Sequence, residues 1–185
     1  MRKTIQNALL KLLETTSINN ISVKDITKHA KIHRATFYVY FSNRNELYET
    51  IIEDTLYELE KAIKPGSNLT FNDIEKLYKN NQDFLNEALL FVQHIQSNKQ
   101  VYISLLKDIH FQERFVSVIH TCIMLGNILP DVYTKYLAYG AVGLVKEWLE
   151  NEYSKSQEEL AIYLTRMNIY ALINYNAENK VKLNK

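Results

Sequence analysis

The sequence predicts an all-α protein of about nine helices, and three features of the chain support this prediction. With only 4 Gly and 2 Pro among 185 residues, it has few of the turn residues that β-sandwiches and barrels use. Apolar residues recur three and four positions apart through most of the chain, which is the spacing of one helix face. Serine, threonine or asparagine precedes several of these segments, where it can cap the first turn of a helix.

Four helices are predicted in the first third of the chain. The apolar face of the first consists of Ile5, Ala8, Leu9, Leu12 and Leu13. The second begins at Ser22, where Asp25 three residues later completes a capping box. The third covers residues 33–40. The fourth starts after Asn43 and stops at Pro65.

Five further helical segments are predicted in the remainder of the chain. Thr70 caps a long helix that runs to about Ser97, and a short segment follows it to Lys107. The remaining three helices are predicted at residues 109–126, 132–151 and 157–176.

Charge is unevenly distributed along the chain, although the formal net charge is only +1. Residues 1–45 carry eight basic and two acidic side chains, a formal charge of +6, and the rest of the chain carries −5. Such a segment indicates contact with a polyanion. The alternative is a chance cluster of basic residues on a solvated face.

We find no sequence signal for export, membrane insertion or catalysis. The N-terminal MRKTIQNALLKLLE is amphipathic and lacks an apolar signal core, and no run of apolar residues is long enough to span a membrane. The single cysteine, Cys122, has no partner for an internal disulfide, so we expect a reducing compartment, the cytoplasm. The chain has no P-loop, dinucleotide-binding turn, G-x-S-x-G or metal-ligand cluster, so we expect no enzyme activity, no metal site and no cofactor.

The segment HRATFYVYFSNRNELY, residues 33–48, places four closely spaced aromatic side chains on and just after a short predicted helix. Phe37 and Phe41 are four positions apart, so they share one face and are predicted to fill a small core. Tyr38 and Tyr40 then point away from that core and either cover the outside of the bundle or face DNA. Tyrosine suits the second role, because its ring contacts sugar or a thymine methyl while its hydroxyl bonds a phosphate or a base edge.

Two short helices joined by a tight turn and supported by a third are the elements of a helix-turn-helix module. The stretch ISVKDITKHAKIHRATFYVYFSNRNELY, residues 21–48, resembles the DNA-binding signature of the TetR family of bacterial transcriptional regulators. The helix order and lengths fit that family over the whole chain. The resemblance implies a helix-turn-helix DNA-binding domain over residues 1–46 and a helical regulatory and dimerisation domain over residues 47–185.

The resemblance also implies a role for particular residues. Positions matching Arg34, Ala35 and Tyr38 contact bases in the family, and the others in the set contact the phosphate backbone or hold the flanking strand. The predicted DNA-binding residues are Ser22, Lys24, His33, Arg34, Ala35, Thr36, Tyr38, Tyr40 and Arg44.

Two departures from the family pattern lie at the turn between the second and third helices. Lys31 stands where the family usually has a glycine, so the turn either tolerates a side chain or is strained there. His33 replaces the usual serine or threonine, which weakens the helix cap but offers a donor to a base or phosphate.

The last two predicted helices resemble the closing pair of many TetR-like proteins, which meets its symmetry mate as a four-helix bundle. A glycine inside a helix costs about 1 kcal/mol, so two on one face indicate close helix approach. The predicted dimer residues are Tyr136, Gly140, Gly143, Leu144, Trp148, Leu160, Tyr163, Leu164, Met167 and Tyr170. The alternative is that these stripes form an intramolecular core.

Aromatic and histidine side chains of the middle helices are candidates for a mixed ligand pocket. The predicted pocket residues are Tyr57, Tyr78, His94, Tyr102, His110 and Phe115. The alternative is that these residues belong to an ordinary core or a solvated helix face, where lone histidines at helical spacing are more often found.

These observations together predict a homodimeric repressor that binds a palindromic double-stranded DNA operator and is released by an unknown small molecule. One alternative is a TetR-like adaptor or co-activator whose second domain binds a protein, and another is an activator of the same architecture. Protein binding predicts a filled interior and an exposed apolar patch on residues 70–130, whereas ligand sensing predicts a cavity there.

Overall fold

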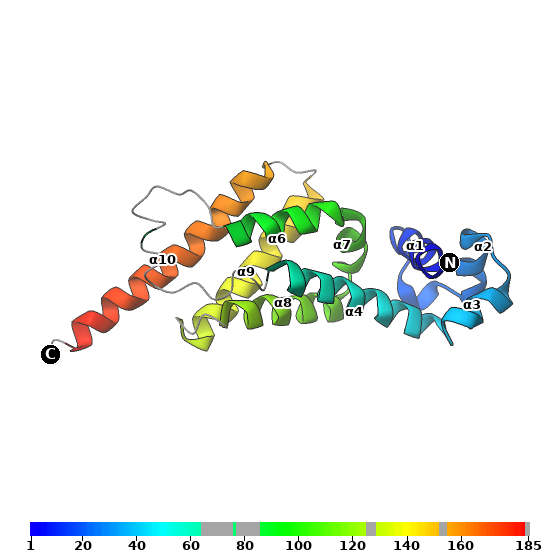
Figure 1. Cartoon of the computed structure of the whole chain (residues 1–185), viewed down its shortest axis with the longest axis horizontal. Coiled ribbons are helices and arrows are strands. Elements are labelled where there is room, and N and C mark those ends of the chain that lie inside the picture. Colours follow the sequence, from blue (N-terminus) through cyan, green and yellow to red (C-terminus); the bar gives the residue numbers. More distant parts are fainter. Residues whose placement is uncertain (64–75, 77–85, 125–128, 152–154, 184–185) are drawn as a thin grey trace.

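The computed structural model describes residues 1–63, 76, 86–124, 129–151 and 155–183, with residues 176–183 described by their backbone alone. The described residues form nine α-helices and one 3-10 helix, and they contain no strand. The predicted all-α fold is therefore confirmed. The molecule is elongated, with the N-terminal helices at one end and the C-terminal part of the last helix at the other (Figure 1).

The N-terminal helices form a small unit, which we call the head (residues 2–41). Its elements are α1 (Arg2–Leu13), the 3-10 helix η1 (Ile18–Asn20), α2 (Val23–Ala30) and α3 (Arg34–Tyr40). Phe37 and Phe41 are 0% and 2% exposed and pack beside Ile5, Leu9 and Ile26, all fully buried. The two phenylalanines thus fill the head's core, as their spacing predicts.

Helix α4 (Arg44–Ile63) leads from the head into the rest of the molecule, which we call the body (residues 86–183) (Figure 1). Asn43 caps it by accepting a hydrogen bond from the backbone N–H of Glu46 at 2.9 Å. The Glu46 carboxylate in turn accepts from the backbone N–H of Ser42. The hydroxyl and N–H of Ser42 hold the pKa of Glu46 below its usual value. The predicted domain boundary between residues 46 and 47 falls inside this continuous helix.

The body consists of five described helices. They are α6 (Asn86–Ser97), α7 (Lys99–Leu105), α8 (Ile109–Met124), α9 (Asp131–Glu150) and α10 (Gln157–Leu183). Helix α8 packs along α9, α10 crosses α6, and α4 packs against both α6 and α8. The predicted helix start at Thr70 lies outside the described residues. Helix α10 extends seven residues beyond the predicted end at residue 176, to Leu183.

Candidate nucleic-acid interface

The turn between α2 and α3 fixes the direction of the second helix. Lys31 follows α2 with φ of 54° and ψ of 46°, the left-handed conformation that usually calls for glycine. The backbone N–H of Ile32 then donates to the carbonyl of Thr27 at 3.0 Å, which closes the end of α2. The turn therefore closes with a lysine, rather than a glycine, in the left-handed position.

Helix α3 presents one buried and one exposed face. Phe37 points into the head, and the rings of Tyr38 and Tyr40 are 46% and 41% exposed. Arg34 and Ala35 are exposed one turn earlier, next to the half-buried Thr36. The outward tyrosines that the sequence predicts are therefore present on the surface of α3.

Arg34 and Tyr38 are joined on this exposed face. The Nη2 and Nε atoms of Arg34 donate to the Tyr38 hydroxyl at 3.0 and 3.3 Å. The guanidinium carbon lies 5.6 Å from the centre of the same ring. The pair holds the Arg34 side chain along α3, with donors left to reach a base edge or phosphate.

The start of α2 contributes further polar groups. The Ser22 hydroxyl accepts from the backbone N–H of Asp25 at 3.2 Å, and the Asp25 carboxylate accepts from the N–H of Ser22 at 2.9 Å. This is the predicted capping box, and its hydrogen bonds from Ser22 lower the pKa of Asp25. Lys24 and Lys28 are exposed on the same helix. Their charges give the exposed side of α2 a positive potential.

Arg44 has an intramolecular role that sequence reasoning missed. Its Nη1 atom donates to the backbone carbonyls of Ile21 at 2.7 Å and Asn19 at 3.1 Å. These carbonyls belong to the segment that leads into α2, so Arg44 ties the start of α4 to the start of α2. A phosphate contact by Arg44 therefore has to use the guanidinium donors that remain.

Two further features of α3 concern His33, at its N-cap, and Val39, near its end. His33 occupies the N-cap position and makes no side-chain capping hydrogen bond, in line with the weak cap expected there. Val39 was not predicted as a site residue, yet it is 76% exposed beside Tyr38. An exposed valine on this helix is suited to contact a thymine methyl. Its position two residues after the inward Phe37, about 200° around the helix, was the available signal.

Comparison with known proteins identifies the family to which this architecture belongs. A family model described as "Bacterial regulatory proteins, tetR family" matches residues 5–51. A second TetR model, described as "Transcriptional regulator C-terminal region", matches residues 71–170, more than half of the chain. The chain belongs to the TetR family. It is therefore a transcriptional regulator with a helix-turn-helix DNA-binding region, and its family and relatives are regulators rather than enzymes.

Two curated relatives of this TetR-family chain are bacterial regulators. The uncharacterized HTH-type transcriptional regulator YxbF of Bacillus subtilis (strain 168) is 27% identical over 164 residues, covering 85% of this chain and 42% of that protein. The dhaKLM operon transcriptional activator DhaS of Lactococcus lactis (strain IL1403) is 33% identical over 104 residues, covering 55% of this chain and 46% of that protein. The chain thus matches less than half of the length of either relative.

Solved structures share the fold of this TetR-family chain. A structure of the dihydroxyacetone kinase operon activator DhaS superposes with a TM-score of 0.60 at 22% identity, over 92% of this chain and 95% of that one. A TetR transcriptional regulator from Streptococcus agalactiae 2603V superposes with a TM-score of 0.63 at 22% identity, over 90% and 92% of the two chains.

The predicted ligand-pocket residues of this TetR-family chain are only partly brought together. Tyr102 and Phe115 are fully buried with ring centroids 5.4 Å apart, and the Nε2 atom of the half-buried His94 lies 3.1 Å from the Tyr102 hydroxyl. Tyr57 is 60% exposed and His110 is exposed, so neither joins this group. Both lie on helix faces turned toward solvent. Tyr78 lies outside the described residues.

The predicted dimer residues divide into two sets. Exposed on α9 and α10 are Tyr136, Gly140, Gly143, Tyr163, Met167 and Tyr170, and Leu144 is half-buried. Trp148, Leu160 and Leu164 are instead 3%, 2% and 8% exposed within the protomer, so little of these side chains is left for a partner to contact. Trp148 follows Tyr136 by twelve residues, and at about 100° per residue it is rotated roughly 120° around the helix, toward the core.

Clusters of metal ligands and membrane-spanning helices are both absent from the part of the chain that the structure describes. No group of three or more His, Cys, Asp or Glu side chains among them is placed to hold a metal ion. Within the same described ranges, each helix is too short or too polar to cross a bilayer.

Proposed function

We propose that the protein binds a palindromic DNA operator as a homodimer and represses transcription until a small molecule releases it. The DNA-binding domain comprises residues 1–46 and the regulatory and dimerisation domain residues 47–185. The observation that carries the proposal is the exposed face of α3, with Arg34, Tyr38 and Val39 directed outward from a head that lies within the positively charged segment of residues 1–45, whose formal charge is +6.

Dimerisation is supported by a band of exposed aromatic and small residues on α9 and α10. Tyr136 and Tyr139 are 75% and 62% exposed, and Tyr170 on α10 is 56% exposed. Exposed aromatic residues that gather on one face are typical of an interaction site. A two-fold axis through this band pairs two identical faces, so the two α3 helices read a palindrome with half-sites about 34–36 Å apart.

Repression needs only operator occupancy, because a dimer bound across a promoter excludes RNA polymerase. Release by a small molecule requires a site in the body that is coupled to α4. The His94–Tyr102 pair is the candidate polar part of that site, because it lies within an apolar interior beside Phe115.

Activation is a second candidate for the sign of regulation. The relative DhaS, 33% identical over 104 residues, is named a transcriptional activator. The same operator-binding dimer activates when its site lies upstream of a promoter rather than across it.

The DNA-binding proposal is tested by selecting bound sequences from random duplexes with the purified protein. We expect enrichment of an inverted repeat, with an affinity that falls steeply between 50 and 200 mM salt because Lys and Arg release counterions from phosphates. A footprint on the DNA beside the gene, read with a promoter fusion, then separates repression from activation. Failure to enrich any sequence at low ionic strength would overturn the proposal.

A further inference from the structure

Helix α1 of the head and helix α4, which follows the head, both contact one short region of the body. Helix α1 packs against α7, and α4 packs against α8 as well as α6. Residues 99–114 of these two helices and their junction, here called the α7–α8 corner, supply the polar groups on the body side of both contacts. The corner is therefore placed to fix the angle between head and body.

The first contact joins the corner to the C-terminal end of α1. Lys107 Nζ donates to the backbone carbonyl of Glu14 at 2.7 Å, and Gln100 Nε2 donates to the Glu14 carboxylate at 2.7 Å. The buried Ser104 hydroxyl lies 3.3 Å from the carbonyl of Leu10. A lysine at this helix end satisfies a carbonyl without an intrahelical partner and interacts favourably with the helix dipole.

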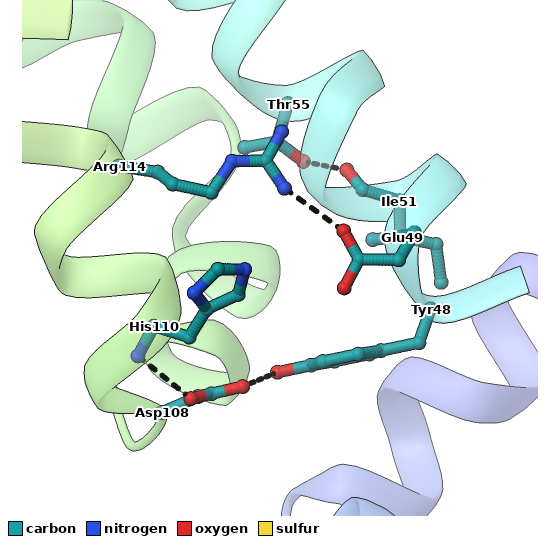
Figure 2. A network of polar contacts seen from close by, with 7 residues as sticks. All are labelled: Tyr48, Glu49, Ile51, Thr55, Asp108, His110 and Arg114. Carbon is teal, nitrogen blue, oxygen red and sulfur yellow. Dashed lines mark hydrogen bonds and ion pairs between the residues drawn. The ribbon is translucent and has the colours of Figure 1, made fainter. Parts of the chain in front are cut away.

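The second contact joins the corner to α4, as Figure 2 shows. The Tyr48 hydroxyl donates to the Asp108 carboxylate at 2.6 Å, and Arg114 pairs with Glu49 at 2.9 Å. Asp108 is itself held in place, because its other oxygen accepts from the backbone N–H of His110 at 2.9 Å. Tyr48 is only 7% exposed, so little water competes for its hydrogen bond.

The same two body helices carry the aromatic interior. Tyr102 of α7 contacts Phe111 and Phe115 of α8, with ring centroids 6.1 and 5.4 Å away. Phe111 and Phe115 are themselves stacked at 5.7 Å. Because packed rings resist gradual deformation, α7 and α8 form one unit that carries both the interior and the corner.

From this placement we propose that the α7–α8 corner sets the orientation of the DNA-binding head, with Tyr48 and Asp108 as positioning residues for operator spacing. The proposal rests on the dimeric operator binding proposed above. Neither residue touches DNA in this account. They act through α4, by holding the two α3 helices of a dimer at one separation.

The dependence of DNA affinity on operator spacing distinguishes a change in head orientation from a general loss of affinity. One added base pair lengthens the operator by about 3.4 Å and turns one half-site about the DNA axis. A head held at a fixed angle cannot follow the displaced half-site, so the dimer loses affinity for the altered operator. A head that has lost its contact with the corner can follow the displaced half-site. Loss of a contact with the corner thus broadens the spacing preference and leaves the protein's contacts with each half-site unchanged.

The experiment uses the full chain, the operator recovered by selection, and versions of it with one base pair added or removed at the centre. The variants are Tyr48→Phe and Asp108→Ala, each of which removes one partner of the hydrogen bond. Tyr57→Phe is the matched control, since it removes a hydroxyl from an exposed ring on the same helix. Affinities for a single half-site are measured alongside, and denaturant unfolding checks that each variant is folded.

We expect the wild-type protein and Tyr57→Phe to prefer the selected spacing by the same factor. In Tyr48→Phe and in Asp108→Ala this factor falls at least fivefold, the lower end of typical coupling between sites, while half-site affinity stays within twofold. The double variant falls no further than either single one, because both remove the same bond.

The outcomes distinguish this proposal from the one on which it rests. If selection yields no operator, the proposed function fails. If an operator is found but Tyr48→Phe keeps the wild-type spacing factor, the corner does not position the head. Equal loss of affinity on every spacing and on the half-site likewise overturns the positioning role, because it indicates damage to the head itself.

Discussion

Lys31 adopts a backbone conformation that disfavours any side chain with a Cβ. At its φ of 54°, glycine is preferred over alanine by roughly 1 kcal/mol. We therefore expect Lys31→Gly to have a free energy of unfolding about 1 kcal/mol above that of Lys31→Ala, measured by urea denaturation. Both variants lose the same charge, so the comparison isolates the backbone.

Position 28 provides the control for this prediction. Lys28 is exposed within α2 rather than after it. There the order reverses, and Lys28→Gly is expected to be about 1 kcal/mol less stable than Lys28→Ala. An equal ranking at both positions would contradict the left-handed turn.

Burial lowers the pKa of His94 below its usual value, against an opposing effect of Glu58. The unfolded chain then binds a proton more readily than the folded one. Stability is therefore retained above the ordinary histidine pKa of about 6.5 and is lost as pH falls below it, down to the folded pKa. We expect His94→Gln to lose less stability than wild type between pH 7 and pH 5 in denaturant titrations. His110→Gln, at an exposed position, serves as the control and should follow wild type.

At the scale of elements, Tyr38 on α3 and Arg44 at the start of α4 have different structural roles. Tyr38 lies on the outer face of α3, whereas Arg44 holds two carbonyls before α2. We expect Tyr38→Ala to abolish operator binding in a gel-shift assay with the free energy of unfolding within about 0.5 kcal/mol of wild type. Arg44→Ala should also lose binding, but with unfolding easier by about 1 kcal/mol, because two hydrogen bonds to a charged group are removed. Wild-type DNA affinity in Tyr38→Ala would contradict the role of α3.

For the whole molecule, the two glycines of α9 distinguish a protomer surface from a dimer interface. A Cβ added at Gly140 or Gly143 meets nothing within 4 Å in the protomer. The double change Gly140→Ala and Gly143→Ala should therefore favour the α9 helix by up to about 1 kcal/mol per site. In a dimer with closely approaching helices the same methyl groups interfere, so sedimentation equilibrium should show a dissociation constant raised at least tenfold. Unchanged dimerisation would place the interface elsewhere.

The local features of the protein could be predicted from the sequence, because they depend on residues within one or two helix turns of each other. The capping box at Ser22, the inward Phe37 and outward Tyr38, and the unusual turn at Lys31 are of this kind. Each follows from side-chain spacing along a single helix or turn, which fixes direction without knowledge of the remaining fold.

Only the tertiary structure decided which helix faces pack inside the protomer and which remain on its surface. Trp148 and Leu164 lie on apolar stripes that fit a dimer interface or a core equally well, and packing against neighbouring helices places them inside. Tyr48 and Asp108 are joined across 60 positions of the chain, a pairing that no local pattern contains. Such choices depend on which helices meet and at what angle, and periodicity along one helix carries no information about either.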